Sequence, residues 1–103
     1  MRGEIWDAHL PRVGDHPVVI LAINRMITRL GAVAAVLVTG GEGPRESHVP
    51  LGPEAGLTEY PESYANATDL FTIPKPSLRR QRGRLNRAEL ASLENAVRIY
   101  LGL

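Results

Sequence analysis

Glycine and proline divide most of this chain into pieces that suit short strands and turns. The 103 residues include ten glycines and eight prolines, and only the end of the chain offers an uninterrupted segment of helical length. Gly40 to Pro44 holds three glycines and a proline in five residues, which excludes regular structure there. This layout is typical of a small β-barrel, so we predict a mainly β fold with a C-terminal α-helix.

The hydrophobic pattern between these turns predicts the strands. Residues 3–10 alternate in the manner of a half-buried strand, whereas the apolar runs at residues 17–23 and 31–39 are typical of fully buried strands. Residues 24–30 have room for a helical turn. The remaining predicted strands are shorter and comprise residues 47–51, 63–68, 70–73 and 80–85. Loops are predicted at residues 52–61 and at the turn 74–76.

The segment from Arg87 to Leu101 is predicted to be helical. Asn86 is a good N-cap residue, Glu89 follows it at the spacing of a capping box, and Gly102 is placed to end the helix. Apolar residues recur along one stripe, which we expect to pack on the sheet. The stripe comprises Leu90, Leu93, Val97, Tyr100 and Leu101.

Length and composition limit the class of protein. A chain of 103 residues with 44% hydrophobic and 22% charged residues is expected to form one domain spanning residues 1–103. No apolar stretch is long enough for a membrane span or a signal peptide, so we expect a cytoplasmic protein without a membrane partner. The absence of cysteine excludes disulfides and thiolate sites, and the spacing of the three histidines disfavours a metal site.

The basic residues are clustered although the net charge is only +1. Six of the twelve lie between Lys75 and Arg87, and eleven of the twelve are arginine, whose planar guanidinium suits phosphate. Such a run is either a solvated strand edge or a surface that contacts nucleic-acid phosphates.

One pair of side chains is predicted to meet at the ends of adjacent strands. His16 stands at the entrance of the second predicted strand, and Thr39 ends the third, beside the glycine-rich loop. The residues alone leave two interpretations open. Thr39 can bond its own loop and His16 can be a solvated histidine, or both can serve a site at which Asp15 orients the imidazole.

Three segments carry a resemblance to a known family. The opening Met1-Arg2-Gly3-Glu4-Ile5-Trp6, followed by residues 15–21 (DHPVVIL), resembles the start of MazF/PemK-type toxins. Residues 63–73 (SYANATDLFTI) and the end of the chain, from Gly83 to Leu103, are similar to that family's later segments. The resemblance spans nearly the whole chain, with its parts in the family's order.

The resemblance implies an SH3-like barrel, a homodimer and a cognate antitoxin as partner. It also implies a metal-independent endoribonuclease that needs no cofactor and cuts single-stranded RNA at short preferred sequences. The ribose 2′-OH attacks the adjacent phosphorus in such enzymes, leaving a 2′,3′-cyclic phosphate and a 5′-OH.

The resemblance also implies which residues do the chemistry. The family's catalytic hydroxyl falls on Thr39, and its catalytic arginine falls on His16, where this chain departs from the pattern. An imidazole ordinarily titrates near pH ~6.5 and can accept and donate a proton, whereas arginine is a fixed cation. The candidate RNA-binding residues are Arg12, Arg25, Asn66, Arg79, Arg80 and Arg82.

Aromatic residues offer weaker hints. Tyr60 and Tyr64 flank a proline-containing loop and are candidates for base stacking, whereas Trp6 is expected in the core.

Two other functions stay open at this stage. The His16 departure is compatible with a relative that binds RNA or antitoxin without cutting. A CcdB-type gyrase-directed toxin would share the barrel, but the C-terminal Leu101-Gly102-Leu103 lacks the tryptophan of that family's end.

Overall fold

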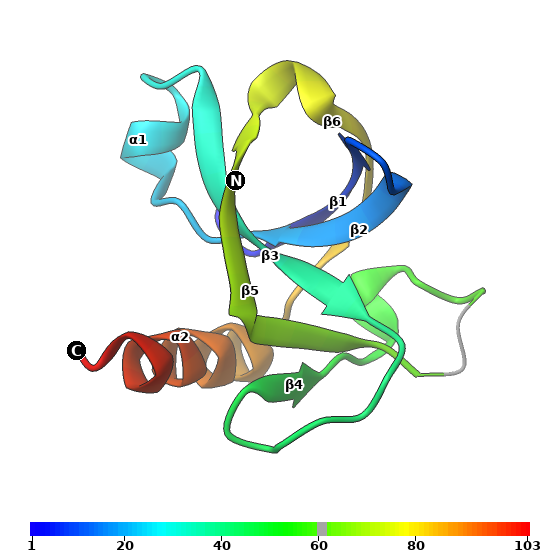
Figure 1. Cartoon of the computed structure of the whole chain (residues 1–103), viewed down its shortest axis with the longest axis vertical. Coiled ribbons are helices and arrows are strands. Elements are labelled where there is room, and N and C mark those ends of the chain that lie inside the picture. The colour runs from blue at the N-terminus through cyan, green and yellow to red at the C-terminus, as the bar shows by residue number, and fades with distance from the viewer. Residues whose placement is uncertain (60–61) are drawn as a thin grey trace.

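The chain folds into one strongly curled antiparallel sheet with a helix against it (Figure 1). The computed structural model describes residues 1–59 and 62–103. Within them the strand order is β4-β5-β3-β2-β1-β6, and no pairing joins the edge strands β4 and β6. The strands are β1 Glu4–Leu10, β2 Gly14–Ile20, β3 Ala32–Thr39, β4 His48–Pro50, β5 Tyr64–Pro74 and β6 Leu78–Arg84. The predicted mainly β fold with a C-terminal helix is confirmed.

The helical segments are short apart from the last one. They are α1 Asn24–Ile27, α2 Arg87–Leu101 and the 3₁₀ turns η1 Pro53–Ala55 and η2 Lys75–Ser77. In the described part of the chain, neither α-helix combines the length and the apolar character that crossing a bilayer requires.

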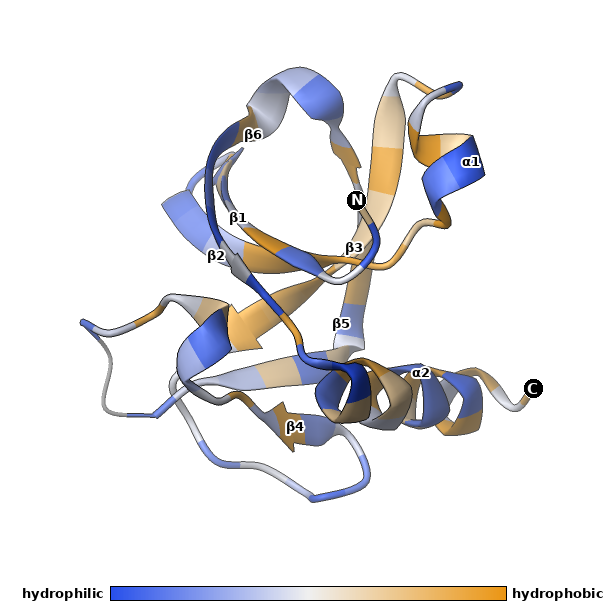
Figure 2. Cartoon of the chain, turned by 180° about the vertical axis from the view of Figure 1, so that it is seen from behind, coloured by the Kyte–Doolittle hydropathy of each residue, from blue (hydrophilic) through white to orange (hydrophobic). Residues whose placement is uncertain are grey.

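The two faces of the sheet bury separate apolar clusters, because successive side chains of a strand point to opposite sides. One cluster lies between the sheet and α2 and is built around Ile5, Val19, Val36 and Leu93. The other lies within the curl and includes Ala8, Val18, Ile20, Val33, Ala35 and Ile73. Figure 2 shows α2 beside β4 and β5, away from the curl.

Helix α2 has the predicted bounds and the predicted ends. The Asn86 side chain accepts a hydrogen bond from the Glu89 N–H, the Glu89 carboxylate accepts from the Asn86 N–H, and Gly102 adopts a left-handed conformation at φ 73°. The second Glu89 oxygen accepts from the Gly52 N–H at 2.6 Å, which fixes the helix to the loop before η1.

The predicted apolar stripe of α2 is correct only for its first turns. Leu93 is fully buried, and Leu90 and Val97 pack against the same cluster. Tyr100 and Leu101 are 54% and 49% exposed, so their predicted packing on the sheet is wrong. The end of α2 extends past the sheet, as Figure 1 shows.

Strand β2 begins and ends three residues earlier than the predicted 17–23. Its pairing with β1 extends to Leu10 opposite Gly14, whose φ of 85° permits the tight turn. His16 therefore lies inside the strand, opposite Ala8, and not at its entrance.

Strand β5 is continuous where two short strands were predicted around Asp69. Leu37 pairs with Asn66 and Val36 with Leu70, so a bulge accommodates the intervening residues without ending the strand. The other predicted strand boundaries agree with the structure to within two residues.

The capping box of α2 should stabilise the fold measurably. We expect Asn86→Ala to lower the free energy of unfolding by about 1 kcal/mol, because the Glu89 N–H loses its acceptor. Asn95→Ala is the matched control: Asn95 is exposed in mid-helix, where alanine favours helix by a few tenths of a kcal/mol. Urea denaturation compares the two, and equal effects would contradict a capping role.

Candidate active site

His16 and Thr39 line the same small cavity. The cavity has a volume of about 120 Å³, and Pro17, Val38, Gly40 and Ser63 complete its lining. The antiparallel pairing of Val18 with Leu37 places the start of β2 beside the end of β3. Continuing that register brings His16 opposite Thr39, on one face of the sheet.

A main-chain carbonyl sets the orientation of the imidazole. His16 Nε2 lies 2.7 Å from the Val38 carbonyl oxygen. Because a carbonyl oxygen only accepts hydrogen bonds, Nε2 must carry the proton, and in the neutral ring the lone pair then lies on Nδ1. The residue at this position is therefore held as a base with its lone pair on a defined atom.

Asp15 does not orient His16, so that prediction is wrong. The Asp15 carboxylate lies 3.1 Å from His9 Nδ1, on the neighbouring strand. Successive residues of a strand point to opposite faces, which separates the side chains of Asp15 and His16.

Thr39 ends β3 as predicted, and its hydroxyl faces the glycine-rich loop. Its Oγ1 donates to the Gly41 carbonyl across 3.4 Å, at the long limit of a hydrogen bond. So long a bond holds the hydroxyl weakly, and an incoming acceptor can replace it.

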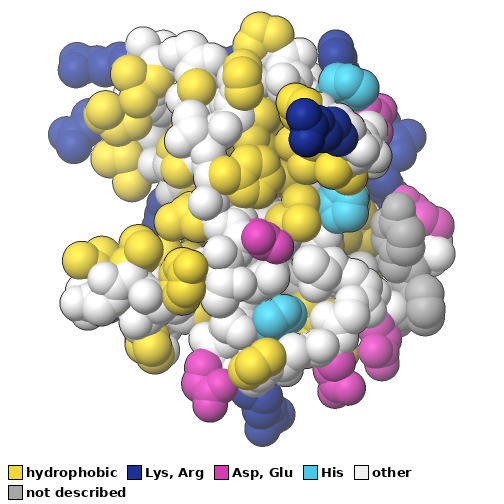
Figure 3. Space-filling model, viewed as in Figure 1, with side chains coloured by type: hydrophobic (Ala, Val, Ile, Leu, Met, Phe, Trp, Pro, Cys, Tyr) yellow, Lys and Arg dark blue, Asp and Glu magenta, His cyan; other side chains and the backbone are white. Residues whose placement is uncertain are grey.

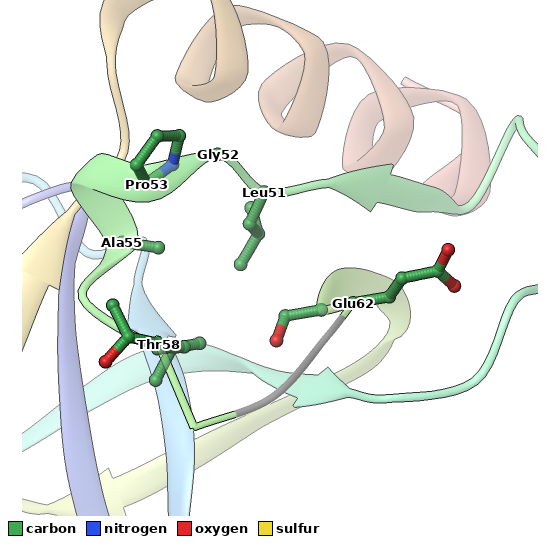
Figure 4. Close-up of a pocket in the computed structure, with 8 residues that line it drawn as sticks. Leu51, Gly52, Pro53, Ala55, Thr58 and Glu62 are labelled. Carbon is green, nitrogen blue, oxygen red and sulfur yellow. The ribbon is translucent and has the colours of Figure 1, made fainter.

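A second cavity lies beside the first and shares Ser63 with it. Its volume is about 270 Å³, and η1 and the segments around it form most of its wall (Figure 4). Leu51 points into this cavity, whereas the carboxylate of Glu62 points away from it. Because the two cavities adjoin at Ser63, a ligand that enters the smaller one can extend into the larger one.

Arg82 holds the loop that follows η1. Its guanidinium donates to both oxygens of Asp7, at 3.1 and 3.2 Å, to the Gly56 carbonyl at 3.3 Å and to the Glu59 carboxylate. The hydrogen bond from Arg82 lowers the pKa of the Glu59 carboxyl. Only 10% of the Arg82 side chain is exposed. The guanidinium that the sequence predicted for RNA is thus engaged within the protein.

Asn66, another predicted RNA-binding residue, is also engaged internally. It is only 9% exposed. Its side-chain oxygen accepts from the N–H and the hydroxyl of Thr68, at 3.0 and 2.7 Å, and its NH₂ donates to Asp69. The amide thus orders the bulge of β5.

The other predicted RNA-binding arginines are solvent-exposed. Arg12, Arg25 and Arg79 are exposed, and the side chain of Arg80 is 68% exposed beside Asp7. Arg80 donates one long hydrogen bond to Asp7, at 3.4 Å, and its side chain stays accessible to a polyanion like those of the other three.

The aromatic residues provide little further support for an RNA site. Tyr64 donates its hydroxyl to Glu62 at 3.2 Å, and burial together with that nearby carboxylate raises the pKa of its phenol. Tyr60 lies outside the described residues. Trp6 is half-buried and packs on the cluster within the curl, as predicted for a core residue.

Sequence reasoning missed two contributors to the smaller cavity, the Val38 carbonyl and Ser63. The alternation of β3 would have aimed the side chain of Val38 away from Thr39, but nothing in the sequence showed that its carbonyl meets His16. Within residues 1–59 and 62–103, no group of three or more His, Cys, Asp or Glu side chains is placed to hold a metal ion.

Comparison with known proteins gives one consistent family. Residues 1–101 match the model of the "PemK-like, MazF-like toxin of type II toxin-antitoxin system". The chain is 31% identical over 101 residues to the probable endoribonuclease MazF2 of Mycobacterium tuberculosis, covering 98% of this chain and 97% of that protein.

Solved structures agree with this match. An endoribonuclease in complex with its cognate antitoxin, from a mycobacterial species, superposes with a TM-score of 0.90 at 25% identity, covering all of this chain and 95% of the other. The M. tuberculosis toxin MazF-mt6 gives a TM-score of 0.86 at 26% identity and 97% coverage of each chain.

The hydrogen-bond partners of the histidines predict opposite tautomers. Neutral His16 should carry its proton on Nε2, because that atom faces the Val38 carbonyl. Neutral His9 should carry it on Nδ1, because that atom faces the Asp15 carboxylate. Imidazole ¹⁵N chemical shifts at a pH above the histidine range distinguish the two. An Nδ1–H tautomer for His16 would contradict the geometry of the cavity.

Proposed function

The chain belongs to the PemK-like, MazF-like toxins of type II toxin–antitoxin systems, and we propose that it is an endoribonuclease that cuts single-stranded RNA without a metal or other cofactor. One observation carries the proposal. A histidine with a fixed tautomer and a weakly held hydroxyl line one cavity, as two groups that act on one phosphodiester must.

The proposed step is an attack of the ribose 2′-OH on the adjacent phosphorus. His16 Nδ1 takes the 2′-OH proton as the bond from the 2′-oxygen to phosphorus forms. The bond from phosphorus to the 5′-oxygen breaks, and that oxygen takes a proton from the imidazolium or from water. The products are a 2′,3′-cyclic phosphate and a 5′-OH.

Thr39 supplies the second group. Its hydroxyl leaves the Gly41 carbonyl and donates to a non-bridging oxygen of the phosphate, where negative charge grows in the transition state. The Val38 carbonyl stays bonded to Nε2–H throughout and stabilises the imidazolium once it forms.

Exposed arginines guide the RNA in this proposal. His16 is neutral when it acts as a base, so it does not neutralise the phosphate permanently as an arginine would. We assign that task to the exposed Arg12, Arg25, Arg79 and Arg80. Arg82 and Asn66 contribute by ordering the protein.

We propose the partners that the family resemblance implies, an antitoxin and a second copy of this chain. A structurally similar mycobacterial endoribonuclease is solved with its cognate antitoxin, which supports an antitoxin for this chain too.

We also propose a homodimer acting in the cytoplasm. Exposed apolar side chains on and around α1 and at the end of α2 lie on the same side of the molecule in Figures 1 and 2 and suit a second copy. They are Ile23, Met26, Leu30, Ile99, Tyr100, Leu101 and Leu103. A monomer mass in sedimentation would contradict the dimer.

Cleavage of a long single-stranded RNA tests the proposed activity. The purified chain should give discrete fragments ending in cyclic phosphate, at the same rate with and without EDTA. Thr39→Ala and His16→Ala should each lower the rate by at least about a hundredfold, as loss of a charge-stabilising donor or a general base does. Ser47→Ala is the control, because that hydroxyl lies outside the cavity.

The outcomes separate the candidate functions. Intact RNA at high protein concentration, with RNA still bound, would favour a relative that binds without cutting. Discrete cuts that survive Thr39→Ala would show that the reaction takes place elsewhere on the protein.

The pH dependence tests His16 as the base. The wild-type rate should rise with pH as the imidazole loses its proton and gains the lone pair that a base needs. His16→Arg restores the residue of the family pattern and should remove that ionisation from the profile. A profile that is flat in the wild type, or unchanged in His16→Arg, would contradict the assignment.

A further inference from the structure

Beside the catalytic cavity, one face of the sheet carries a surface that suits a nucleobase. Along β3, Thr39, Leu37 and Ala35 share a face, because alternate residues of a strand point the same way. Strand β5 pairs Asn66 with Leu37 and Phe71 with Ala35 on that face. Leu37 and Phe71 are half-buried, so each packs on the core and still offers part of its surface. Figure 3 shows this side, where hydrophobic side chains gather beside histidine and acidic ones.

The bulge of β5 places a carboxylate next to this apolar surface. Asp69 is exposed and belongs to the residues inserted between Asn66 and Leu70. Its Oδ2 accepts from the Asn66 NH₂ at 3.3 Å, while the Asn66 oxygen holds Thr68. Its Oδ1 makes no hydrogen bond to the described residues. A largely buried amide thus holds the carboxylate with one oxygen left to accept.

From this arrangement we propose that Leu37, Phe71 and Asp69 bind the base beside the scissile linkage, and that Asp69 selects a base bearing an amino group. The inference rests on the proposed function, which it deepens by naming part of the RNA specificity.

The spacing fits a neighbouring nucleotide. Leu37 lies two residues before Thr39 on one face of β3, a distance of about 7 Å along the strand. A nucleotide whose phosphate contacts Thr39 can therefore place its base over Leu37. Phe71, opposite Ala35 and two residues further along β3, then lies at the far edge of that base. Unstacked RNA bases commonly lie on aromatic side chains and are read at their hydrogen-bonding edges.

The chemistry of the carboxylate gives the selectivity. An ionised carboxylate only accepts hydrogen bonds. Adenine, cytosine and guanine each present an amino group to it, whereas the N3–H of uracil lies between two carbonyl oxygens that a carboxylate repels. Uracil should therefore be rejected at this position.

A cleavage map of a random-sequence RNA tests this assignment. The wild type should disfavour uracil at one position next to the cut by about tenfold, the discrimination of one good base contact. Asp69→Asn should abolish that discrimination, because a carboxamide can donate to O4 of uracil and accept from its N3–H. Glu46→Gln removes the same charge from a residue that lines a groove against α2, and it should leave the preference unchanged.

Phe71→Leu tests the stacking surface while it preserves apolar packing. Its affinity for single-stranded RNA should fall about tenfold whatever the base, as loss of one stacked base predicts. Thermal unfolding checks that the variant is folded.

Binding to Thr39→Ala separates this inference from the proposed activity. On the timescale of a binding measurement, cutting by this variant should be negligible. The variant should then bind short oligo(A) and oligo(C) more tightly than oligo(U), and adding Asp69→Asn should remove the difference. A wild type that cuts no RNA contradicts the proposed nuclease and leaves this binding test decisive. An unchanged base preference in Asp69→Asn would overturn the inference. It would also be overturned if Asp69→Asn changed only the oligomeric state of the protein.

Discussion

The pairing of β2 with β3 is the constraint on which the site depends. It brings the beginning of one strand to the end of the other, so that an imidazole and a hydroxyl from residues far apart in sequence face one cavity. The same pairing presents the Val38 carbonyl to His16. A shift of β2 against β3 by one residue would put His16 and Thr39 on opposite faces of the sheet. The apolar residues that fix this register, such as Val18 and Val36, therefore also position the candidate pair.

Local signals were enough to predict much of the fold. Asn86, Glu89 and Gly102 act through contacts a few residues apart, and the bounds of α2 followed from them. The strands bounded by glycine and proline could be predicted from the sequence in the same way. The effects of long-range strand pairing could not be predicted. Strand β2 starts at Gly14 because β1 lies beside it, and β5 continues through Asp69 because β3 supports the bulge. Tyr100 and Leu101 continue an apolar stripe beyond the last residue that the sheet can cover.

The candidate site likewise has features that the sequence predicts and features that depend on long-range contacts. The family resemblance singled out His16 and Thr39, and strand order brings them together. A list of arginines could not show which guanidiniums are already occupied. Arg82 and Arg80 are two residues apart in β6 and both contact Asp7. Arg82 is also bonded to Gly56 and Glu59 and is nearly buried, whereas Arg80 makes only a long bond to Asp7 among the described residues and is mostly exposed. The sequence held no sign of that difference, because the partners come from β1 and from the loop after η1.

In the proposed mechanism, histidine stands where the family resemblance implies a catalytic arginine, and this difference changes what the rest of the site must supply. A guanidinium neutralises the phosphate at every physiological pH but is a poor base, because its pKa lies far above neutrality. An imidazole is a good base, but while it acts as one it carries no charge. The cationic task then falls on residues outside the cavity, and attraction from exposed arginines weakens as salt rises. In the proposed mechanism the Val38 carbonyl fits this requirement, because its bond to Nε2–H leaves Nδ1 to accept the proton and stabilises the imidazolium that would form.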